Sequence, residues 1–476
     1  MNTLLFTPLS TKEYYDLMYL VKQVLTFEYP TDMVLSKFFR EHKTLTTSHK
    51  NIIAETVYGL IRNYYKLTKY VKSIDSSNID KNNIDKSSID KSSIGKNNVN
   101  IKNVRDLDNV DNADNVYNID KNNIHNLIGL VWIKILQLPV EFYNTSKFKM
   151  KFNIDYARLA KIDFTDKQFL DDTTSRTELP QFIINRLLQH YTQEEVFAIA
   201  TAMQSRADLD LRVNIVKTDV KTVFNQLQQE GLSPQLTQFS PYGIRLKDKT
   251  QFARHKLFLS GAIEVQDESS QIAGMLLNPK RGDMIVDFCA GGGGKTLLLG
   301  MLMRNTGRIY AFDINEKRLN NLTPRLQRSG LSNIHPQLIA HENDTKVKRL
   351  YGKADKVFVD APCSGFGTLR RNPELKFRQT DLGIDELNIK QRSILSQAAK
   401  LVKLNGYLVY ATCSILHAEN QDIVKDFLAN HPDFKLVDAD SVLHIPELKR
   451  DDGFISLLPN LHNTDGFFAG LLQRVA

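Results

Sequence analysis

Three apolar segments in the second half of the chain each run directly into a loop that carries a cysteine. These loops hold Cys289, Cys363 and Cys413, which are the only three cysteines of the sequence. Helical patterning separates the apolar segments, and strands that alternate with helices are typical of a mostly parallel, doubly wound α/β sheet. Ligands bind such sheets at the carboxyl ends of the strands. We therefore expect the three cysteines to face one crevice.

A run of glycines follows the first of these segments. Gly291 to Gly294 lie between an apolar strand and an apolar helix, and Asp313 closes the next strand. Glycines let the backbone approach a ligand closely, and an acid at the end of the second strand can bind ribose hydroxyls. The pattern fits NAD, nucleotides and S-adenosylmethionine alike. A nucleotide-hydrolysing P-loop is not favoured, because Cys289 stands where that motif requires its first glycine.

The pair Cys363 and Cys413, together with Asp360, separates these candidates. Hydride transfer does not need two thiols, whereas methylation of carbon 5 of cytosine does need one. A thiolate that adds to carbon 6 makes carbon 5 nucleophilic, which is covalent catalysis. A free thiol is mostly protonated at neutral pH, so the site should supply positive charge, and Lys295 is the candidate. Asp360 can accept a hydrogen bond from the exocyclic amine that cytosine has and uracil lacks.

Each of these residues also has a simpler interpretation. A cysteine at the end of a buried strand is more often a small apolar filler than a nucleophile, and we favour that interpretation for Cys289. Asp360 could cap a loop, and Lys295 could be a solvated lysine at the start of a helix. The basic stretch 370–378 could be a solvated loop, although its place shortly after Cys363 suits it to hold phosphates.

Length and charge set the broad class. A chain of 476 residues exceeds what one hydrophobic core usually supports, so two or three domains are expected. A net charge of +8 favours an anionic partner such as nucleic acid. The cysteines form no C-x-x-C pair, which predicts neither a disulfide framework nor a metal site and indicates a reducing compartment. Because we find neither a leader sequence nor a long apolar run, we expect a cytoplasmic protein without a membrane segment.

The chain divides into three predicted domains. Residues 1–175 show helical periodicity and are predicted to form a bundle, interrupted at 73–123 by a low-complexity stretch rich in Asn, Asp, Lys and Ser. We expect this insertion to be disordered, so that deletion of residues 75–120 leaves the activity largely intact. Residues 176–265 alternate helix and strand signals as an α+β module, and residues 266–476 carry the doubly wound sheet.

The two later cysteine loops resemble a known family. The motifs Asp360-Ala361-Pro362-Cys363-Ser364-Gly365 and Thr412-Cys413-Ser414 resemble the RsmB/Nop family of RNA 5-methylcytosine methyltransferases. The likeness extends to residues 266–270, 287–290, 293–296, 371–376 and 419–420. The resemblance implies a class I, Rossmann-like methyltransferase domain that is preceded by an α+β RNA-binding module. Through residues 27–30 and 38–41 it also implies an all-α, NusB-like bundle at the N-terminal side.

The resemblance further implies a role for each site residue. Cys413 would be the nucleophile, and Cys363 the thiol that assists release of the methylated base. Asp360 and Lys295 would orient and polarise the cytosine. The residues that would hold S-adenosylmethionine are Cys289, Ala290, Gly291, Gly292, Gly293, Gly294, Lys295, Asp313, Asp344 and Asp360.

The chain departs from the family pattern at two places. Gly291–Gly292 stands where Ala-Pro is common, which loosens the cofactor loop, and Phe377 stands where Trp is common. The sequence nevertheless predicts a monomeric enzyme that methylates carbon 5 of a cytosine in structured RNA, without a metal and without a membrane partner. Ribosomal RNA is favoured over transfer RNA only through the resemblance of the N-terminal part.

Two rivals come from other classes. A DNA cytosine methyltransferase would normally use one nucleophile after the strand of the second motif, which would leave Cys413 idle. A non-catalytic RNA-binding assembly factor would tolerate the loss of Cys413, Asp313 and Lys295, yet all three are present. Separate replacement of each cysteine distinguishes the first rival from the RNA enzyme.

Overall fold

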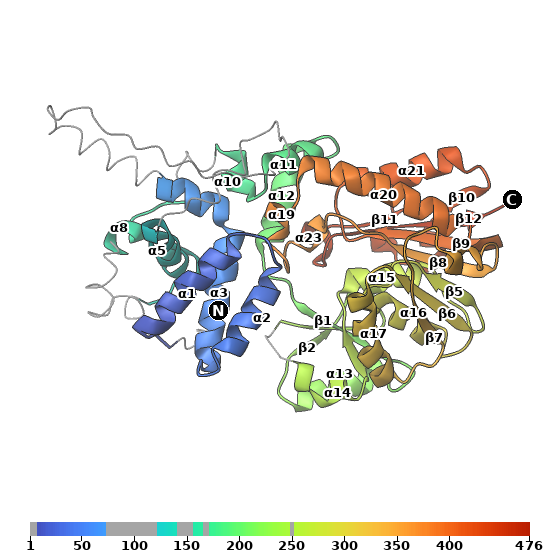
Figure 1. The fold of residues 1–476 in the computed structure, drawn as a ribbon, viewed down its shortest axis with the longest axis horizontal. Coiled ribbons are helices and arrows are strands. Elements are labelled where there is room, and N and C mark those ends of the chain that lie inside the picture. The colour runs from blue at the N-terminus through green and yellow to red at the C-terminus, as the bar shows by residue number, and fades with distance from the viewer. Residues whose placement is uncertain (1–6, 73–120, 140–155, 165–170, 248–251) are drawn as a thin grey trace. The chain divides into compact units, whose positions relative to one another are not determined.

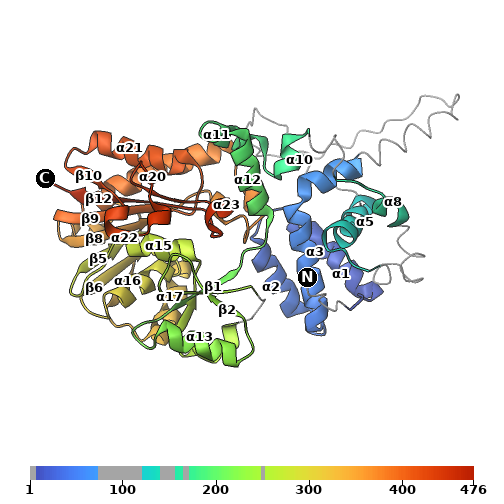
Figure 2. The same cartoon turned by 180° about the vertical axis from the view of Figure 1, so that it is seen from behind.

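The chain forms two compact units, which Figure 1 and Figure 2 show from opposite sides. The first is Met1–Gln181 with Asn372–Arg378, and the second is Phe182–Arg371 with Gln379–Ala476. The computed structural model describes residues 7–72, 121–139, 156–164, 171–247 and 252–476. The insertion predicted at 73–123 lies outside the described residues except for its last three positions, and the domain boundaries at 175 and 265 stay predictions.

Every described element of the first unit is helical. Ser10 and Glu13 form a capping box that starts the first helix. Apolar residues spaced three and four apart then build a core around Trp132, whose indole N–H donates to the Thr56 hydroxyl at 2.8 Å. Residues 64–72 are helical as well, and the labelled elements are α1 (Thr11–Val24), α2 (Thr31–Glu41), α3 (Thr47–Arg62), α5 (Lys121–Leu130), the π-helix η1 (Val131–Ile135), α8 (Tyr156–Ala160), α10 (Thr173–Thr177) and α19 (Leu375–Arg378). The likeness of this unit to NusB stays a prediction.

The last of these helices comes from far along the chain and is built into this unit. Lys376 is buried, lies 3.5 Å from Glu178 and donates to the Arg62 carbonyl at 3.1 Å. The Phe377 ring stacks on Phe27 with 4.3 Å between ring centroids. Lys376 is therefore not part of a solvated basic loop. It is also not free to bind a phosphate, as was expected for stretch 370–378, because the Glu178 carboxylate neutralises its charge.

A four-stranded antiparallel sheet opens the second unit. Its strands follow the order β2-β3-β1-β4, and one face packs on helices through an apolar cluster that includes Leu211, Ile244 and Ile263. The alternate residues of the same strands are charged, as the period of two in a strand requires. The elements are α11 (Gln181–Leu188), α12 (Gln193–Gln204), β1 (Leu209–Val213), α13 (Val220–Gln229), β2 (Pro234–Leu236), β3 (Gly243–Leu246), the 3-10 helix η2 (Phe252–Arg254), α14 (Lys256–Leu259) and β4 (Ile263–Val265).

An eight-stranded mixed sheet forms the rest of the second unit. Its order is β10-β12-β9-β8-β5-β6-β7, with β11 paired to β12. The central strands β5 to β9 are parallel, as predicted, whereas β12 runs antiparallel to its neighbours. The strands are β5 (Met284–Asp287), β6 (Arg308–Asp313), β7 (Ile334–Leu338), β8 (Ala354–Asp360), β9 (Val402–Thr412), β10 (Phe434–Val437), β11 (Ile455–Leu457) and β12 (Phe467–Arg474).

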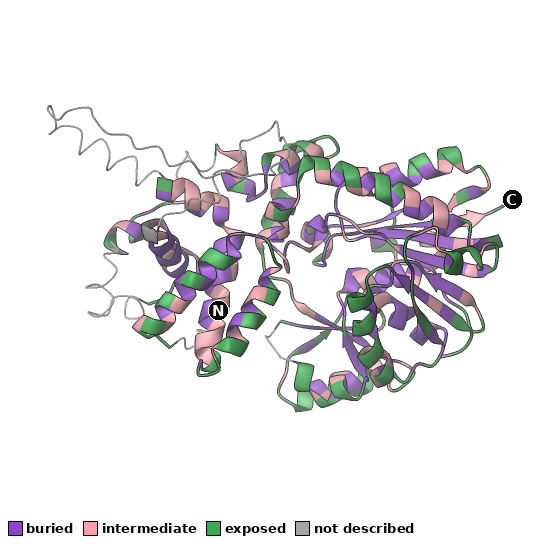
Figure 3. Ribbon diagram, in the orientation of Figure 1, coloured by how far each residue is buried: buried purple, intermediate pink, exposed green. Residues whose placement is uncertain are grey.

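Helices cover both faces of this sheet, and its central strands are buried (Figure 3). Helices α15, α16 and α17 contribute Ile272, Leu297 and Leu322 to one core. Helices α20 and α21 contribute Leu395 and Ile423 to the core on the other face. The helical elements are α15 (Glu268–Leu276), α16 (Gly294–Leu302), α17 (Glu316–Ser329), α18 (Thr345–Lys348), η3 (Phe366–Thr368), α20 (Asp381–Ala399), η4 (His417–Glu419), α21 (Gln421–Asn430), α22 (Asp440–Leu443), η5 (Pro446–Leu448) and α23 (Pro459–His462). No helix in the described part of the chain has the length and hydropathy to span a membrane.

Candidate functional site

Two of the three cysteines meet at the carboxyl ends of neighbouring strands. Strands β8 and β9 are parallel, and Asp360 lies opposite Ala411 where they finish, so both end at the same edge. The loops that follow them, called here the Cys363 loop and the Cys413 loop, bring the two sulfur atoms to 3.3 Å. Cys289 follows β5 at the same edge and packs against the apolar core, and burial raises the pKa of its thiol.

A buried carboxylate joins these two loops. Glu419, at the end of the 3-10 helix η4, accepts hydrogen bonds from the Ser364 amide at 2.8 Å, from the Ser364 hydroxyl at 2.5 Å and from the Ser414 hydroxyl at 2.5 Å. Gln391 of α20 donates to it as well, at 3.1 Å. Because each serine directly follows a cysteine, the carboxylate holds the two thiols in one arrangement.

The backbone segments that follow Cys363 and Cys413 also contact each other, and two glycines make this close approach possible. The Gly367 amide donates to the Cys413 carbonyl at 2.9 Å, and the Gly466 amide donates to the Gly367 carbonyl at 2.8 Å. A Cβ atom at Gly367 would lie 2.0 Å from the Gly466 carbonyl oxygen, which no side chain can tolerate. The close approach therefore requires glycine.

Lys295 and Asp360 form an ion pair beside the thiols. The lysine nitrogen lies 2.7 Å from the Asp360 carboxylate and 5.0 Å from the centre of the Phe467 ring. Burial alone lowers the pKa of Lys295, but the attraction of Asp360, with a smaller contribution from Cys413, outweighs it and raises this pKa. The ammonium group therefore stays charged at neutral pH.

The glycine loop lines a cavity of about 400 Å³. Asp313 closes β6 behind this loop and accepts a hydrogen bond from the Gly291 amide at 2.8 Å. Asp287 lies in the wall of the cavity, and one of its carboxylate oxygens is buried without a hydrogen-bond partner among the described residues. The cavity is lined by Val265, Gln266, Asp267, Ser270, Asp287, Cys289, Ala290, Gly291, Gly292, Gly294, Lys295, Arg325, Asp360, Arg371 and Asp465.

Most of the residues expected to bind the cofactor thus lie at this cavity. Asp313 reaches the cavity only through Gly291, and Gly293 shapes the loop with a φ of 81°. Asp344 is not among the lining residues; its carboxylate accepts from the Ala340 and Lys346 amides and caps α18. Its role in cofactor binding stays a prediction.

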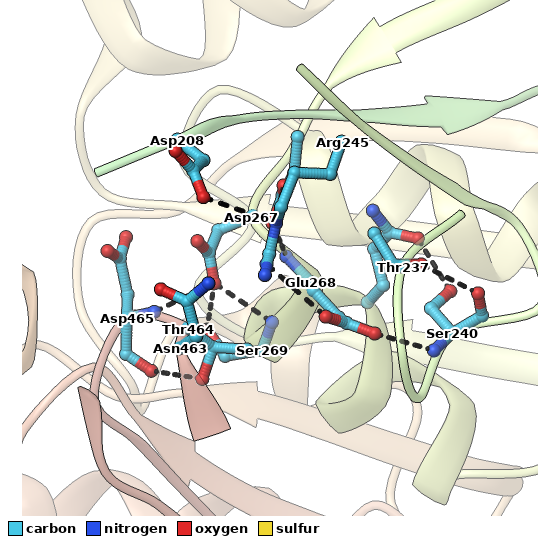
Figure 4. A network of polar contacts seen from close by, with 12 residues as sticks. Asp208, Thr237, Ser240, Arg245, Asp267, Glu268, Ser269, Asn463, Thr464 and Asp465 are labelled. Atoms are coloured by element: carbon cyan, nitrogen blue, oxygen red, sulfur yellow. Dashed lines mark hydrogen bonds and ion pairs between the residues drawn. The ribbon is translucent and has the colours of Figure 1, made fainter. Parts of the chain in front are cut away.

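Sequence reasoning missed a second set of polar residues around the cavity. Arg371 bridges two buried carboxylates, Asp267 at 2.7 Å and Asp465 at 2.6 Å. Figure 4 shows how Asp267 and Asp465 belong to one network with Arg245 and Glu268. Only the resemblance of residues 266–270 and 371–376 pointed to this region.

Two arginines hold the glycine loop itself, and no motif pointed to them. Arg212 of β1 donates to the Gly294 carbonyl at 2.7 Å, and Arg325 of α17 donates to the Gly292 carbonyl at 2.6 Å. The described residues hold no cluster of three or more His, Cys, Asp or Glu side chains that could bind a metal ion.

Comparisons with known proteins place this site in a family. The family model of the 16S rRNA methyltransferase RsmB/F matches residues 274–473, and a model of the ferredoxin-like domain of RsmF/B-like methyltransferases matches residues 179–253. The chain is 31% identical over 310 residues to a probable ribosomal RNA small subunit methyltransferase B of Bacillus subtilis, covering 63% of this chain and 67% of that protein. The chain belongs to the RsmB/F methyltransferase family.

The chain is also similar to a eukaryotic protein and to a solved structure. A mouse 28S rRNA (cytosine-C(5))-methyltransferase is 30% identical over 311 residues, which cover 62% of this chain and 38% of that protein. The crystal structure of PH0851 shares the fold, with a TM-score of 0.73 and 24% identity over 98% of this chain and all of that one. The matched region spans about two thirds of the length of the Bacillus subtilis relative.

An RsmB/F methyltransferase takes its methyl group from S-adenosylmethionine, and the cavity suits that cofactor. Its wall presents glycine backbone and the Asp287 oxygen that lacks a partner, both of which can bind a polar ligand. The second unit accordingly combines a Rossmann-like methyltransferase domain with a ferredoxin-like domain.

Proposed function

We propose that this protein methylates carbon 5 of a cytosine in ribosomal RNA through a covalent adduct between Cys413 and carbon 6. The observation that carries the proposal is the pair of thiols, which lie 3.3 Å apart. They lie at the same strand edge as Cys289 and Asp360, which line the cofactor cavity. One thiol would suffice for a packing role, whereas two in contact suit a reaction that attacks a base and later releases it.

Two features support Cys413 as the nucleophile. The charged Lys295 ammonium interacts electrostatically with Cys413, which brings a positive charge near this sulfur atom. The pKa of Cys363 is raised by its contact with Cys413 and by burial, so Cys363 stays a thiol at neutral pH. A thiol in that place can donate its hydrogen to the Cys413 sulfur.

Asp360 and Lys295 would read and polarise the cytosine. The Asp360 carboxylate can accept a hydrogen bond from the exocyclic amine of cytosine, which uracil lacks. Lys295 holds this carboxylate at 2.7 Å and can balance the negative charge that develops on the ring when the thiolate adds. Their pairing in the free enzyme supports this role, because it orients both groups before the base arrives.

S-adenosylmethionine supplies an electrophilic methyl group. Residues 289–295 would hold it through backbone groups, together with Asp313 and Asp344. The Cys413 thiolate would add to carbon 6, and carbon 5 would then take the methyl group, with S-adenosylhomocysteine as the leaving group. A base then removes the proton from carbon 5, the bond from carbon 6 to sulfur breaks, and Cys413 leaves as a thiolate. A solvent water is the base that takes this proton, and the Cys363 thiol, which lies 3.3 Å from the departing sulfur, donates a hydrogen bond to that sulfur and so assists release.

Ribosomal RNA is the substrate that the relatives favour. The Bacillus subtilis and mouse proteins are both named as ribosomal RNA methyltransferases. A target inside a duplex would have to be flipped out, at a cost of about a few kcal/mol, so a loop or an unfolded assembly intermediate is an easier substrate. Transfer RNA remains the alternative substrate.

The test is a trapping experiment. A Cys363→Ala variant is incubated with S-adenosylmethionine and total ribosomal or transfer RNA, and we expect a protein–RNA adduct that survives denaturing gel electrophoresis. A second Cys413→Ala change should abolish the adduct, whereas Cys289→Ala, the matched control, should leave it in place. Sequencing of the trapped strand identifies the RNA.

Two outcomes would overturn the proposal. An adduct that persists in the Cys413→Ala background but needs Cys363 would exchange the roles of the two thiols. The absence of an adduct with every RNA, when DNA oligonucleotides do form one, would instead favour the DNA methyltransferase.

A further inference from the structure

The charged face of the ferredoxin-like sheet is buried and contacts the methyltransferase domain. Arg212, Arg245 and Glu264 alternate along β1, β3 and β4 with the apolar residues of the other face, and all three are buried. Arg245 forms ion pairs with Asp210 at 2.7 Å and with Glu268 of α15 at 3.3 Å. This face therefore lies inside the second unit, where RNA cannot reach it.

Two contacts lead from this face directly to the glycine loop. The Arg212 guanidinium donates to the Gly294 carbonyl at 2.7 Å and also to the Gln266 side chain. Glu264 holds Arg325 at 3.0 Å, and Arg325 in turn donates to the Gly292 carbonyl at 2.6 Å. The sheet thereby restrains two peptide units of the loop, one directly and one through an ion pair.

The loop needs such restraint because of its composition. It contains four consecutive glycines, and glycine loses more conformational freedom on ordering than any other residue. A loop that samples many conformations binds its ligand more weakly, since binding must bear the cost of ordering it. Arg212 does not line the cavity, so it has no direct route to a ligand there.

We propose that Arg212 and Arg325 are positioning residues for S-adenosylmethionine, so that the part of the charged face formed by Arg212 and Glu264 supports the cofactor loop rather than an RNA-reading surface. Arg212 acts through the Gly294 carbonyl. Arg325, which also lines the cavity, acts through the Gly292 carbonyl. This inference rests on the cofactor of the proposed function, not on its RNA substrate.

The experiment compares Arg212→Met with Arg245→Met in the full-length protein. The two arginines lie on the same face, and each is buried, but Arg245 makes no hydrogen bond to the glycine loop. Both variants should melt at a lower temperature, because each leaves a buried polar partner unsatisfied. By isothermal calorimetry, only Arg212→Met should weaken binding of S-adenosylmethionine and of S-adenosylhomocysteine, by about tenfold.

Two further readouts separate positioning from general damage. Arg212→Lys keeps the charge and one donor, so it should recover part of the affinity. With saturating cofactor, kcat of Arg212→Met should stay within about twofold of wild type while KM for the cofactor rises by about tenfold, as expected for a loss of binding alone. Binding of RNA without cofactor, measured by fluorescence anisotropy, should not change.

Each remaining outcome counts against the inference. If the folded Arg212→Met protein binds the cofactor as tightly as wild type, or if Arg245→Met loses as much affinity, the arginine is only structural. Weaker RNA binding by Arg212→Met would instead assign this face to RNA. A wild-type protein that binds no S-adenosylmethionine would contradict the proposed function itself, and this result is distinguishable because it precedes any substitution.

Discussion

Glu419 is one buried carboxylate that joins the two cysteine loops of the candidate site. Its side chain is fully buried, and its carboxylate oxygens accept hydrogen bonds from Ser364 and Ser414, which directly follow the two cysteines. Hydrogen bonds to a charged acceptor are stronger than neutral ones, so the loops gain both stability and a defined spacing of the two sulfur atoms.

Glu419→Gln should therefore damage both stability and catalysis. The amide keeps the shape but turns one acceptor into a donor that faces serine donors, so the free energy of unfolding should fall by about 1–3 kcal/mol. We expect kcat to fall by about tenfold or more, since small shifts of catalytic groups are costly. Urea denaturation and single-turnover methylation measure the two effects. Glu447→Gln, an exposed control, should change neither, and an active Glu419→Gln enzyme would contradict this role.

Asp287 should make stability depend on pH. Burial raises the pKa of Asp287 to about 7, with further repulsion from Asp360 that Thr296 and Lys295 only partly offset. The unfolded chain releases this proton at about pH 4, so between about pH 4 and 7 only the folded form keeps it. The resulting stabilisation is fully present below about pH 4 and is lost as the pH rises through about 7.

Asp287→Asn removes this titration. Relative to Asp287→Asn, the wild-type protein should lose free energy of unfolding between pH 5 and pH 8. Urea midpoints at four pH values in this range measure the difference. Parallel pH profiles for the two proteins would show that Asp287 already titrates at its ordinary pKa in the folded state.

At the scale of elements, the carboxyl edge of the large sheet is ordered by loops that cross closely. Gly367 is the middle residue of the short 3-10 helix η3 that follows Cys363, and its backbone lies against the backbones of Cys413 and Gly466. The loops after β8 and β9 and the start of β12 thus meet at one point. A change at this crossing moves the Cys413 loop directly.

Gly367→Ala should disable the enzyme without disturbing its sheet. The new Cβ would lie 2.0 Å from the Gly466 carbonyl oxygen and 2.8 Å from the Cys413 carbonyl oxygen, so the backbone must shift. We expect the rate of methyl transfer to fall by about a hundredfold, because a displacement near 1 Å has that effect on catalytic geometry. Single-turnover kinetics measure it. Gly383→Ala, where the nearest atom is a Thr380 side chain at 3.0 Å, is the control and should retain activity.

At the scale of the whole molecule, the two units are not consecutive in sequence. Asn372–Arg378 lies between two stretches of the second unit yet belongs to the first, where Phe377 stacks on Phe27 and Lys376 pairs with Glu178. Burial lowers the pKa of Lys376 to about 8 and raises the pKa of Glu178, so each group depends on the other. Removal of only one partner of a buried ion pair strongly destabilises the folded protein, because the other charge stays buried without a partner.

A fragment that begins at residue 182 should therefore fold poorly. It retains Lys376 and Phe377 but loses the core that buries them, which leaves an apolar ring and a lysine segment without their partners. We expect low soluble yield and a lower melting temperature than the full chain. Co-expression of residues 1–181 as a separate chain should restore solubility. A fragment that melts like the full-length protein would show that the segment 372–378 is dispensable.

Much of the candidate site could be predicted from local sequence. Apolar runs that end in Cys289, Cys363 and Cys413 indicate strands, and parallel strands bring their carboxyl ends to one edge, so Lys295 and Asp360 were expected nearby. Arg212 and Arg325 were not expected, because their partners are glycine carbonyls 82 and 33 residues away, and a carbonyl has no sequence signature. The burial of Lys376 could not be predicted either, because its partner Glu178 is distant in sequence.

The sequence by itself determined the chemistry and the type of sheet. Strand periodicity, glycine spacing and cysteine motifs are local properties, and hydrophobic burial turns them into a Rossmann-like edge that carries two thiols. Only the tertiary structure decided the 3.3 Å spacing of the sulfur atoms, the role of Glu419 between their loops, and the antiparallel direction of β12. It also decided that the charged face of the ferredoxin-like sheet is buried. A buried charge needs an oppositely charged partner, and the partners of Arg245 and Glu264 are distant in sequence.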